Sequence, residues 1–268
     1  MRVFETLFVG GVVEKPGSII YLENITVNFD GFQALREVDF YVDRGELRAL
    51  IGPNGAGKTT LLDVICGKVK PDTGRIIFGD NIDLTTLEEH EITMLGIGRK
   101  FQTPSVFKNL TLVENLTLAL RQPRGVWSTL FGSMGAEQMD KIAPTLETLG
   151  LLDKAHHQAG SLAHGEMQWL EIGMVIVQEP ALFLLDEPVA GMTKDEREKT
   201  GQLLQRLAQD HAVLVVEHDM EFVRQTAQRV TVLHEGSVLC EGSVDMVQRN
   251  PRVIEVYLGR GHNVDAHH

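Results

Sequence analysis

Two kinds of hydrophobic pattern alternate along this chain. Continuous apolar runs occupy 181–185 and 212–216, and acidic residues end each run. Such runs are typical of strands buried on both faces of a parallel sheet. The polar, helix-forming stretch 194–209 lies between them, as a right-handed strand-helix-strand crossover requires. The pattern therefore predicts an α/β fold built on parallel strands.

Shorter strand signals lie toward both ends of the chain. Residues 20–27 alternate imperfectly, which is typical of an edge strand, and an apolar run at 47–51 follows a turn. The glycines of 74–79 enclose a short predicted strand. Residues 229–242 predict a closing hairpin that turns at a Glu-Gly dipeptide. Together these segments predict a strand-rich start and a mixed sheet.

The stretch 111–157 has a different texture. Leucine-rich amphipathic segments surround 124–138, which is rich in Gly and Ser and shows little periodicity. We interpret this region as a helical lobe with a long irregular connection. Trp127 and Phe131 in that connection either pack the lobe onto itself or bind a partner.

Composition and charge exclude several classes of protein. The 268 residues are 43% hydrophobic, enough to bury a large core, and the net charge is −12. An acidic chain without a basic patch is repelled by nucleic acid and by anionic lipid, so no nucleic-acid partner is expected.

Cys66 and Cys240 stand in apolar contexts, as in a protein of a reducing compartment. The run 1–13 contains Glu5, lacks a cleavage site and is too short to span a bilayer, so we expect a cytoplasmic protein.

The sharpest chemical signal is the stretch GPNGAGKTT at 52–60. It follows the predicted strand 47–51 and opens an apolar helix. In such a P-loop the glycines let backbone N–H groups surround phosphates, Lys58 neutralises the β and γ charges, and the Thr59 hydroxyl ligates Mg²⁺. The predicted nucleotide-binding residues of the loop are Gly52, Pro53, Asn54, Gly55, Ala56, Gly57, Lys58, Thr59 and Thr60.

The second half of a nucleoside triphosphate site is expected at the ends of the buried strands. Asp186 ends one apolar run and is placed to hold Mg²⁺ through water, while the adjacent Glu187 is the candidate general base for the attacking water. His218 follows the next apolar run, so it is expected to reach the γ-phosphate from the same edge of the sheet.

The stretch SLAHGEMQWLEI at 161–172 places a small residue, a His and a Gly where a helix begins. A helix N-terminus presents unsatisfied N–H groups and favours anions. The order of the motifs resembles that of ATP-binding-cassette ATPases. Along the chain come the P-loop, a Gln at 102, the helical lobe, this stretch, LFLLDEP and VVEHD. The resemblance runs from about residue 20 over nearly the whole remaining chain.

The resemblance implies a fold and a domain organisation. It implies a P-loop NTPase core with a mixed sheet, an N-terminal antiparallel β subdomain and an inserted α-helical lobe. A single ATPase domain is expected at 19–258, with the lobe at about 103–178. An extension at 1–18 precedes it, and a tail at 259–268 follows.

The resemblance also assigns roles. Phe29 would stack on adenine, with Phe32 as the other candidate, and Gln102 would sense Mg²⁺ and the attacking water. His218 would be the switch histidine, and 188–192 the loop between subunits. The signature loop would clamp the γ-phosphate bound to a second ATPase subunit, a copy or a paralogue. Its residues are Leu162, Ala163, His164, Gly165 and Glu166.

One residue departs from the family's signature. Ala163 stands where the family has a Ser whose hydroxyl holds the γ-phosphate, and a hydrogen bond to a charged group is worth about 1.5–3 kcal/mol. The N–H groups and the helix dipole remain, so a weakened clamp is expected.

The motifs resemble the ATPase subunits of importers for branched-chain amino acids, urea and short amides, and HGEMQWLEIGM most resembles the urea branch. The favoured interpretation is a peripheral ATPase on the cytoplasmic face of the membrane. It would dock onto permease subunits and serve an extracytoplasmic solute-binding protein indirectly, with urea or a short amide as the expected solute. The alternatives are a branched-chain amino acid importer, a soluble cassette ATPase and a weakly hydrolysing regulatory module.

Overall fold

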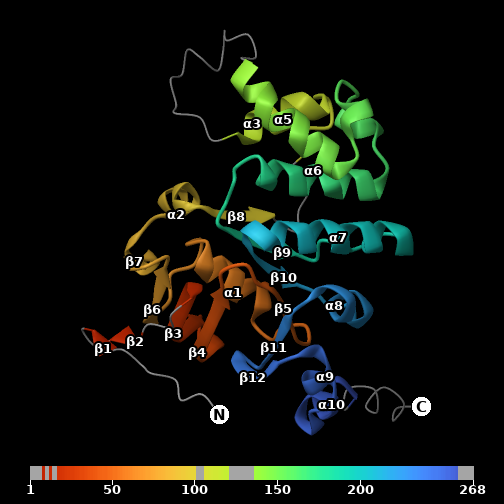
Figure 1. The fold of residues 1–268 in the computed structure, drawn as a ribbon. Coiled ribbons are helices and arrows are strands. Elements are labelled where there is room, and N and C mark those ends of the chain that lie inside the picture. Colours follow the sequence, from red (N-terminus) through yellow and green to blue (C-terminus); the bar gives the residue numbers. More distant parts are fainter. Residues whose placement is uncertain (1–7, 10–11, 14–16, 101–105, 121–135, 259–268) are drawn as a thin grey trace.

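The computed structural model describes residues 8–9, 12–13, 17–100, 106–120 and 136–258 (Figure 1). A six-stranded sheet has the strand order β12-β11-β5-β10-β9-β8. Only the pairing of β11 with β12 is antiparallel; the other neighbours are parallel. The bounds of these strands are β5 (Leu47–Ile51), β8 (Ile97–Lys100), β9 (Leu182–Asp186), β10 (Ala212–Val216), β11 (Arg229–His234) and β12 (Ser237–Gly242).

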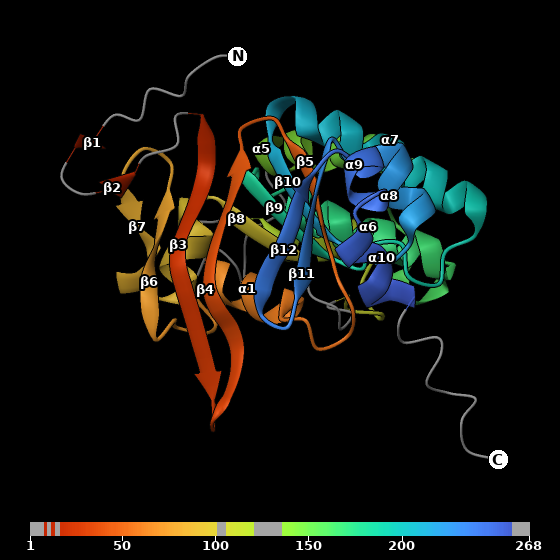
Figure 2. The same cartoon turned by 90° about the horizontal axis from the view of Figure 1, so that it is seen from below.

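A second, antiparallel sheet lies beside the first, as Figure 2 shows, with the order β4-β3-β6-β7. A separate pair, β1 with β2, precedes it. The bounds are β1 (Phe8–Val9), β2 (Val12–Val13), β3 (Ser18–Phe29), β4 (Phe32–Asp43), β6 (Thr73–Phe78) and β7 (Ile82–Asp83). The two sheets confirm the predicted α/β class with a mixed sheet and an N-terminal antiparallel β subdomain.

The prediction of an edge strand at 20–27 is wrong, because β3 pairs with β4 on one side and β6 on the other. The imperfect alternation has a different cause. Ile20 and Leu22 are buried, then Ile25 and Val27, so the buried positions change phase around Asn24, whose φ is 50°. The pairing register shifts at the same place. A bulge inside an interior strand therefore produces the irregular pattern.

Helices cover both faces of the six-stranded sheet and also form a separate lobe. Helix α1 packs its buried face into one apolar cluster with strands of both sheets, and α7 and α8 cover the other face of the six-stranded sheet. Helices α3, α5 and α6 share a separate core and form the lobe above α7 in Figure 1. The bounds are α1 (Lys58–Ile65), α2 (Glu89–Leu95), α3 (Leu112–Ala119), α5 (Ala136–Leu149), α6 (His164–Ile176), α7 (Lys194–Asp210), α8 (Met220–Thr226), α9 (Val244–Gln248) and α10 (Pro251–Leu258). Short 3₁₀ helices cover Leu84–Thr86, Leu152–Lys154 and Ala159–Ser161.

Two further predictions concern the hairpin at 229–242 and the crossover between the buried strands. The closing hairpin is confirmed: Glu235 and Gly236 both have positive φ, as a two-residue type I′ turn requires. The crossover β9-α7-β10 is confirmed as well. The domain boundaries remain predictions, and Trp127 and Phe131 lie outside the described residues.

Candidate active site

The P-loop runs from the end of β5 to the start of α1. Gly57, immediately before the helix, has φ 101°, and a Cβ there would lie 2.6 Å from the Ala34 carbonyl oxygen. Only glycine fits this conformation in this space. In the described part of the chain no side chain caps α1. Its first N–H groups are therefore available to an anion.

Lys58 reaches back across the loop. Its Nζ donates hydrogen bonds to the carbonyl oxygens of Gly52, at 2.8 Å, and Pro53, at 3.0 Å. Burial lowers the pKa of Lys58, while the negative charges of Glu187 and Asp186 oppose that shift. The ammonium group is thus fixed between the loop and the two carboxylates, where the charge of a triphosphate would be neutralised.

A cavity of about 470 Å³ opens over the P-loop. Its size suits a cofactor-sized ligand. Its lining residues are Phe29, Phe32, Ala34, Asn54, Gly55, Ala56, Gly57, Lys58, Thr59, Thr60, Asp186, Glu187 and Val216. Aromatic rings, helix N–H groups, an ammonium group and two carboxylates therefore meet in one cavity, as a purine nucleoside triphosphate requires.

Both candidate adenine-stacking residues line this cavity. Phe29 ends β3 and Phe32 begins β4, and the two residues pair across a two-residue turn. Phe29 is 45% exposed and Phe32 is 62% exposed, so both rings present free surface to a base. The choice of Phe29 remains a prediction.

Asp186 ends β9 as a buried carboxylate. It is 3% exposed, and its Oδ2 has no hydrogen-bond partner within the described structure. Burial raises the pKa of Asp186, and the positive charge of Arg99 opposes the shift. No group of three His, Cys, Asp or Glu residues among the described residues could hold a metal ion by itself. A buried carboxylate with an unpartnered oxygen beside a phosphate-binding loop fits Mg²⁺, which keeps several waters and takes other ligands from phosphates.

Glu187 follows Asp186 in a backbone conformation that few residues adopt. Its φ is 46°, in the left-handed region, and its N–H donates to the Val216 carbonyl oxygen of β10 at 2.9 Å. Its Oε1 lies 3.7 Å from Nδ1 of His218, whose side chain is 68% exposed. The structure thus brings the predicted base and the predicted switch histidine together.

Glu217 directly precedes His218 in the chain and is not among the residues predicted from the sequence. It is 1% exposed. Its Oε1 accepts the Val189 N–H at 3.3 Å and its Oε2 accepts the His218 N–H at 3.1 Å. Burial raises the pKa of Glu217, and these backbone hydrogen bonds oppose the shift. A charged residue directly after the apolar run 212–216 was the available signal.

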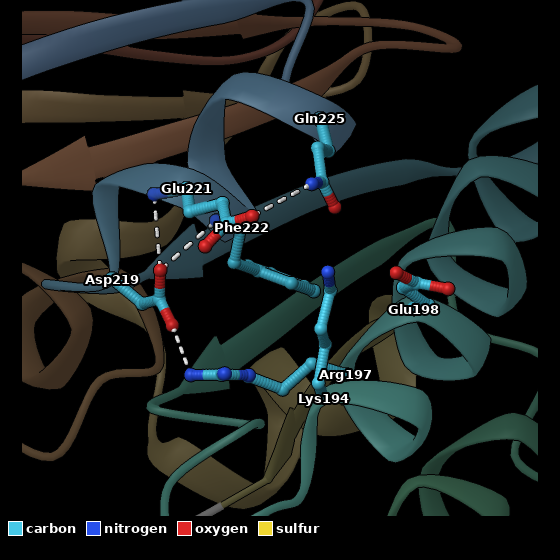
Figure 3. A pocket seen from close by; sticks show the side chains of 7 residues that line it. All are labelled: Lys194, Arg197, Glu198, Asp219, Glu221, Phe222 and Gln225. Carbon is cyan, nitrogen blue, oxygen red and sulfur yellow. Dashed lines mark hydrogen bonds and ion pairs between the residues drawn. The ribbon is translucent and has the colours of Figure 1, made fainter.

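Figure 3 shows the place where the starts of α7 and α8 lie side by side. Arg197 of α7 donates to Asp219 Oδ2 at 2.7 Å, and Asp219 Oδ1 caps α8 by accepting the N–H groups of Glu221 and Phe222. The hollow between them has a volume of about 10 Å³, room for about one water molecule. It therefore joins α7 to α8 and is too small for a substrate.

The predicted signature loop forms the N-terminus of α6 and does not line the P-loop cavity. The Ala163 N–H donates to Glu166 Oε2 at 3.1 Å, and Lys154 Nζ lies 2.5 Å from Glu166 Oε1. The hydrogen bond from Lys154 is the main cause of a lowered pKa of Glu166. Within one chain these residues lie apart from the nucleotide cavity, so their predicted role requires a second subunit.

The signature loop contacts the loop after Glu187 in the same chain. His164 Nε2 lies 3.1 Å from the Ala190 carbonyl oxygen, and because that oxygen can only accept, the nitrogen carries the proton. A Cβ at Gly165 would lie 2.2 Å from Glu196 Oε1, so the helix start packs tightly against α7. Gln102 lies outside the described residues.

The chain is similar to known ATP-binding-cassette proteins. Residues 35–190 match the ABC transporter family, and residues 237–263 match the family described as branched-chain amino acid ATP-binding cassette transporter. The high-affinity branched-chain amino acid transport ATP-binding protein LivG of Escherichia coli (strain K12) is 35% identical over 250 residues, which cover 90% of this chain and 98% of LivG.

The solved structures that resemble this fold are also ATP-binding cassettes of ABC transporters. The ADP conformation of an ATP-binding cassette of an ABC transporter superposes with a TM-score of 0.82 at 32% identity, over 90% of this chain and 99% of that one. A dimeric bacterial ABC transporter cassette superposes with a TM-score of 0.71 at 28% identity, over 84% of this chain and 98% of that one.

The fold and the cavity define a nucleotide-binding P-loop ATPase. The chain belongs to the ABC transporter family, as its ATP-hydrolysing subunit. No helix within the described ranges is long and apolar enough to cross a membrane.

Proposed function

We propose that this chain hydrolyses ATP to drive the import of branched-chain amino acids. The observation that carries the proposal is similarity over nearly the full length of LivG, together with the match of residues 237–263 to a branched-chain amino acid family. Neither comparison mentions urea. From the sequence alone we favoured urea, with branched-chain amino acids as the alternative, and the similarity to LivG supports that alternative.

The proposed chemistry uses the groups around the cavity. The P-loop N–H groups and Lys58 hold the phosphates, and Glu187 takes a proton from the attacking water while His218 contacts the γ-phosphate. Thr59, Asp186 and Gln102 are the proposed ligands of Mg²⁺, which would neutralise charge on the phosphates when bound. Glu187 requires a fixed orientation for this task, and its two backbone hydrogen bonds, to Val216 and from Ala190, provide it.

The proposed assembly contains two ATPase subunits and the permease subunits. A signature loop outside the cavity of its own chain supports a dimer in which each loop, Ala163 to Glu166 in this chain, covers the nucleotide of the other subunit. The proposed place of the protein is the cytoplasmic face of the membrane, with a solute-binding protein acting indirectly through the permease.

Ala163→Ser is expected to tighten the ATP-bound dimer. The new hydroxyl would stand at the N-cap of α6, where it donates to a phosphate of the other subunit, and one hydrogen bond to a charged group is worth about 1.5–3 kcal/mol. Dimerisation in the presence of ATP measures the gain, with Lys58→Ala as the control that lacks phosphate binding. An unchanged dimerisation constant would remove Ala163 from the clamp.

Phe107→Glu is expected to uncouple transport from ATP hydrolysis. Phe107 is 56% exposed, and the side-chain amide of buried Asn115 fixes its backbone through bonds of 2.8 and 3.1 Å. The ring is thus presented on the surface, as docking onto a permease helix requires. Val106 packs on the lobe core, so Val106→Glu is expected to lower the thermal stability instead. Measuring uptake, hydrolysis and melting together separates the two; a Phe107→Glu protein that melts early would assign the ring to the core.

Uptake by cells that lack the gene tests the proposal. We expect these cells to lose high-affinity uptake of radiolabelled leucine, isoleucine and valine but to retain uptake of urea. A plasmid copy of the gene should restore uptake, and a Lys58→Ala copy should not. Loss of urea uptake with normal leucine uptake would reverse the assignment of the solute.

A further inference from the structure

Glu217 is a buried carboxylate that none of the proposed roles uses. It directly follows β10, and its own N–H donates to the Leu50 carbonyl oxygen of β5 at 3.3 Å. A buried ionisable group is costly unless hydrogen bonds satisfy it. The partners that satisfy Glu217 belong to two different segments, and each segment contains a proposed catalytic residue.

The first segment is the turn after Glu187. Val189 is 4% exposed and donates its N–H to Glu217 Oε1 at 3.3 Å. The same turn contains the hydrogen bond of 3.2 Å from the Ala190 N–H to the Glu187 carbonyl oxygen. Because Glu187 adopts φ 46°, its conformation persists only where the surrounding contacts fix it. The bond to Glu217 is one of those contacts.

The second segment carries the switch histidine. Oε2 of Glu217 accepts the His218 N–H at 3.1 Å and the Asp219 N–H at 3.5 Å. One rigid carboxylate therefore holds the backbone of both catalytic turns, one turn on each oxygen. The side chains of Glu187 and His218, one from each turn, approach to 3.7 Å.

We propose that Glu217 is a positioning residue that sets the geometry of Glu187 relative to His218, and through it the orientation of the general base. This inference rests on the proposed roles of those two residues. It assigns Glu217 no contact with the nucleotide, because Glu217 does not line the cavity. Its effect should therefore appear in the rate of the chemical step and not in nucleotide binding.

Glu217→Gln is the sharpest variant. A carboxylate accepts hydrogen bonds on both oxygens, whereas an amide has one acceptor oxygen and one NH₂ donor. In either orientation the NH₂ group would face a backbone N–H, so the amide can hold only one of the two turns. A misplacement of about 1 Å near the chemistry costs on the order of 10²-fold. We expect kcat to fall about 10- to 100-fold while KM for ATP stays within about twofold.

Two controls separate positioning from a purely structural role. Glu46→Gln makes the same change at another buried glutamate, at the far end of β5 from the P-loop, and is expected to lower the melting temperature without lowering kcat. The double variant Glu187→Gln/Glu217→Gln should hydrolyse no more slowly in a single turnover than Glu187→Gln alone, because Glu217 acts through Glu187. If Glu217 has a purely structural role, the rate losses of the two single variants should multiply in the double variant.

Each outcome decides the inference. If Glu217→Gln does not fold, Glu217→Asp keeps both oxygens but withdraws them by one methylene, and it should also lower kcat at unchanged KM. A folded Gln or Asp variant with the parental kcat, or losses that multiply in the double variant, would overturn the inference. If Glu187→Gln itself hydrolyses at the parental rate, the proposed role of Glu187 fails instead.

Discussion

Glu187→Gln is expected to reduce ATP turnover by on the order of 10² or more, because general base assistance contributes about that much. The amide cannot accept the proton of the attacking water, while the P-loop and Lys58, which hold the phosphates, are unchanged. Nucleotide binding should therefore be preserved, and an ATP-bound dimer should accumulate because hydrolysis no longer opens it.

Single-turnover hydrolysis and size-exclusion chromatography with ATP measure these two effects. Glu179→Gln is a matched control, since Glu179 also has a positive φ but lies in an exposed ion pair with Lys141. It should keep the parental rate. A Glu187→Gln protein that turns over ATP like the parent would exclude Glu187 as the base and leave His218 as the candidate to examine.

Lys100→Met is expected to destabilise the fold by about 3–5 kcal/mol, because it leaves a buried charge without its partner. Lys100 ends β8 and Glu171 lies in α6, and the two are 4% exposed each. Their Nζ and Oε2 atoms are 3.2 Å apart, and Oε1 of Glu171 has no other partner within the described structure. The pair joins the sheet to the helix that begins with the signature loop.

Replacing both charges at once provides the control. Lys100→Met/Glu171→Leu removes the buried charges together, and such replacements are often neutral or stabilising. In denaturant unfolding, the double variant should have a free energy of unfolding close to that of the parent, and Lys100→Met a much lower one. Equal losses in the single and double variants would show that packing, and not charge pairing, holds this joint.

The predicted site residues that the structure brings together at the cavity belong to local signals in the sequence. The P-loop is one continuous segment between a strand and a helix, and Asp186 and Glu187 follow an apolar run, so the chain itself places them at one edge of the sheet. The signature loop was predicted from a helix start for the same reason. The contact of His164 in this loop with Ala190 was not predicted, because the two loops meet only after the lobe packs on the core.

The features that the sequence did not reveal depend on distant partners. In the sequence Glu217 is one acidic residue among several after a strand, and its proposed role follows from the backbone N–H groups around it. The ion pair of Lys100 with Glu171 joins segments far apart in the chain. The bulge at Asn24 changes which alternate positions of β3 are buried. The sequence does not show where this change occurs, so the irregular alternation was interpreted as an edge strand.

ATP-driven leucine accumulation in membrane vesicles tests the central claim most directly. The vesicles contain the permease subunits and either the parent chain or Glu187→Gln, with leucine, the solute-binding protein and ATP supplied on their proper sides. We expect the parent to accumulate labelled leucine, with competition by isoleucine and valine but not by urea. The variant should bind ATP without accumulating leucine. Equal accumulation by both proteins, or competition by urea alone, would contradict the account.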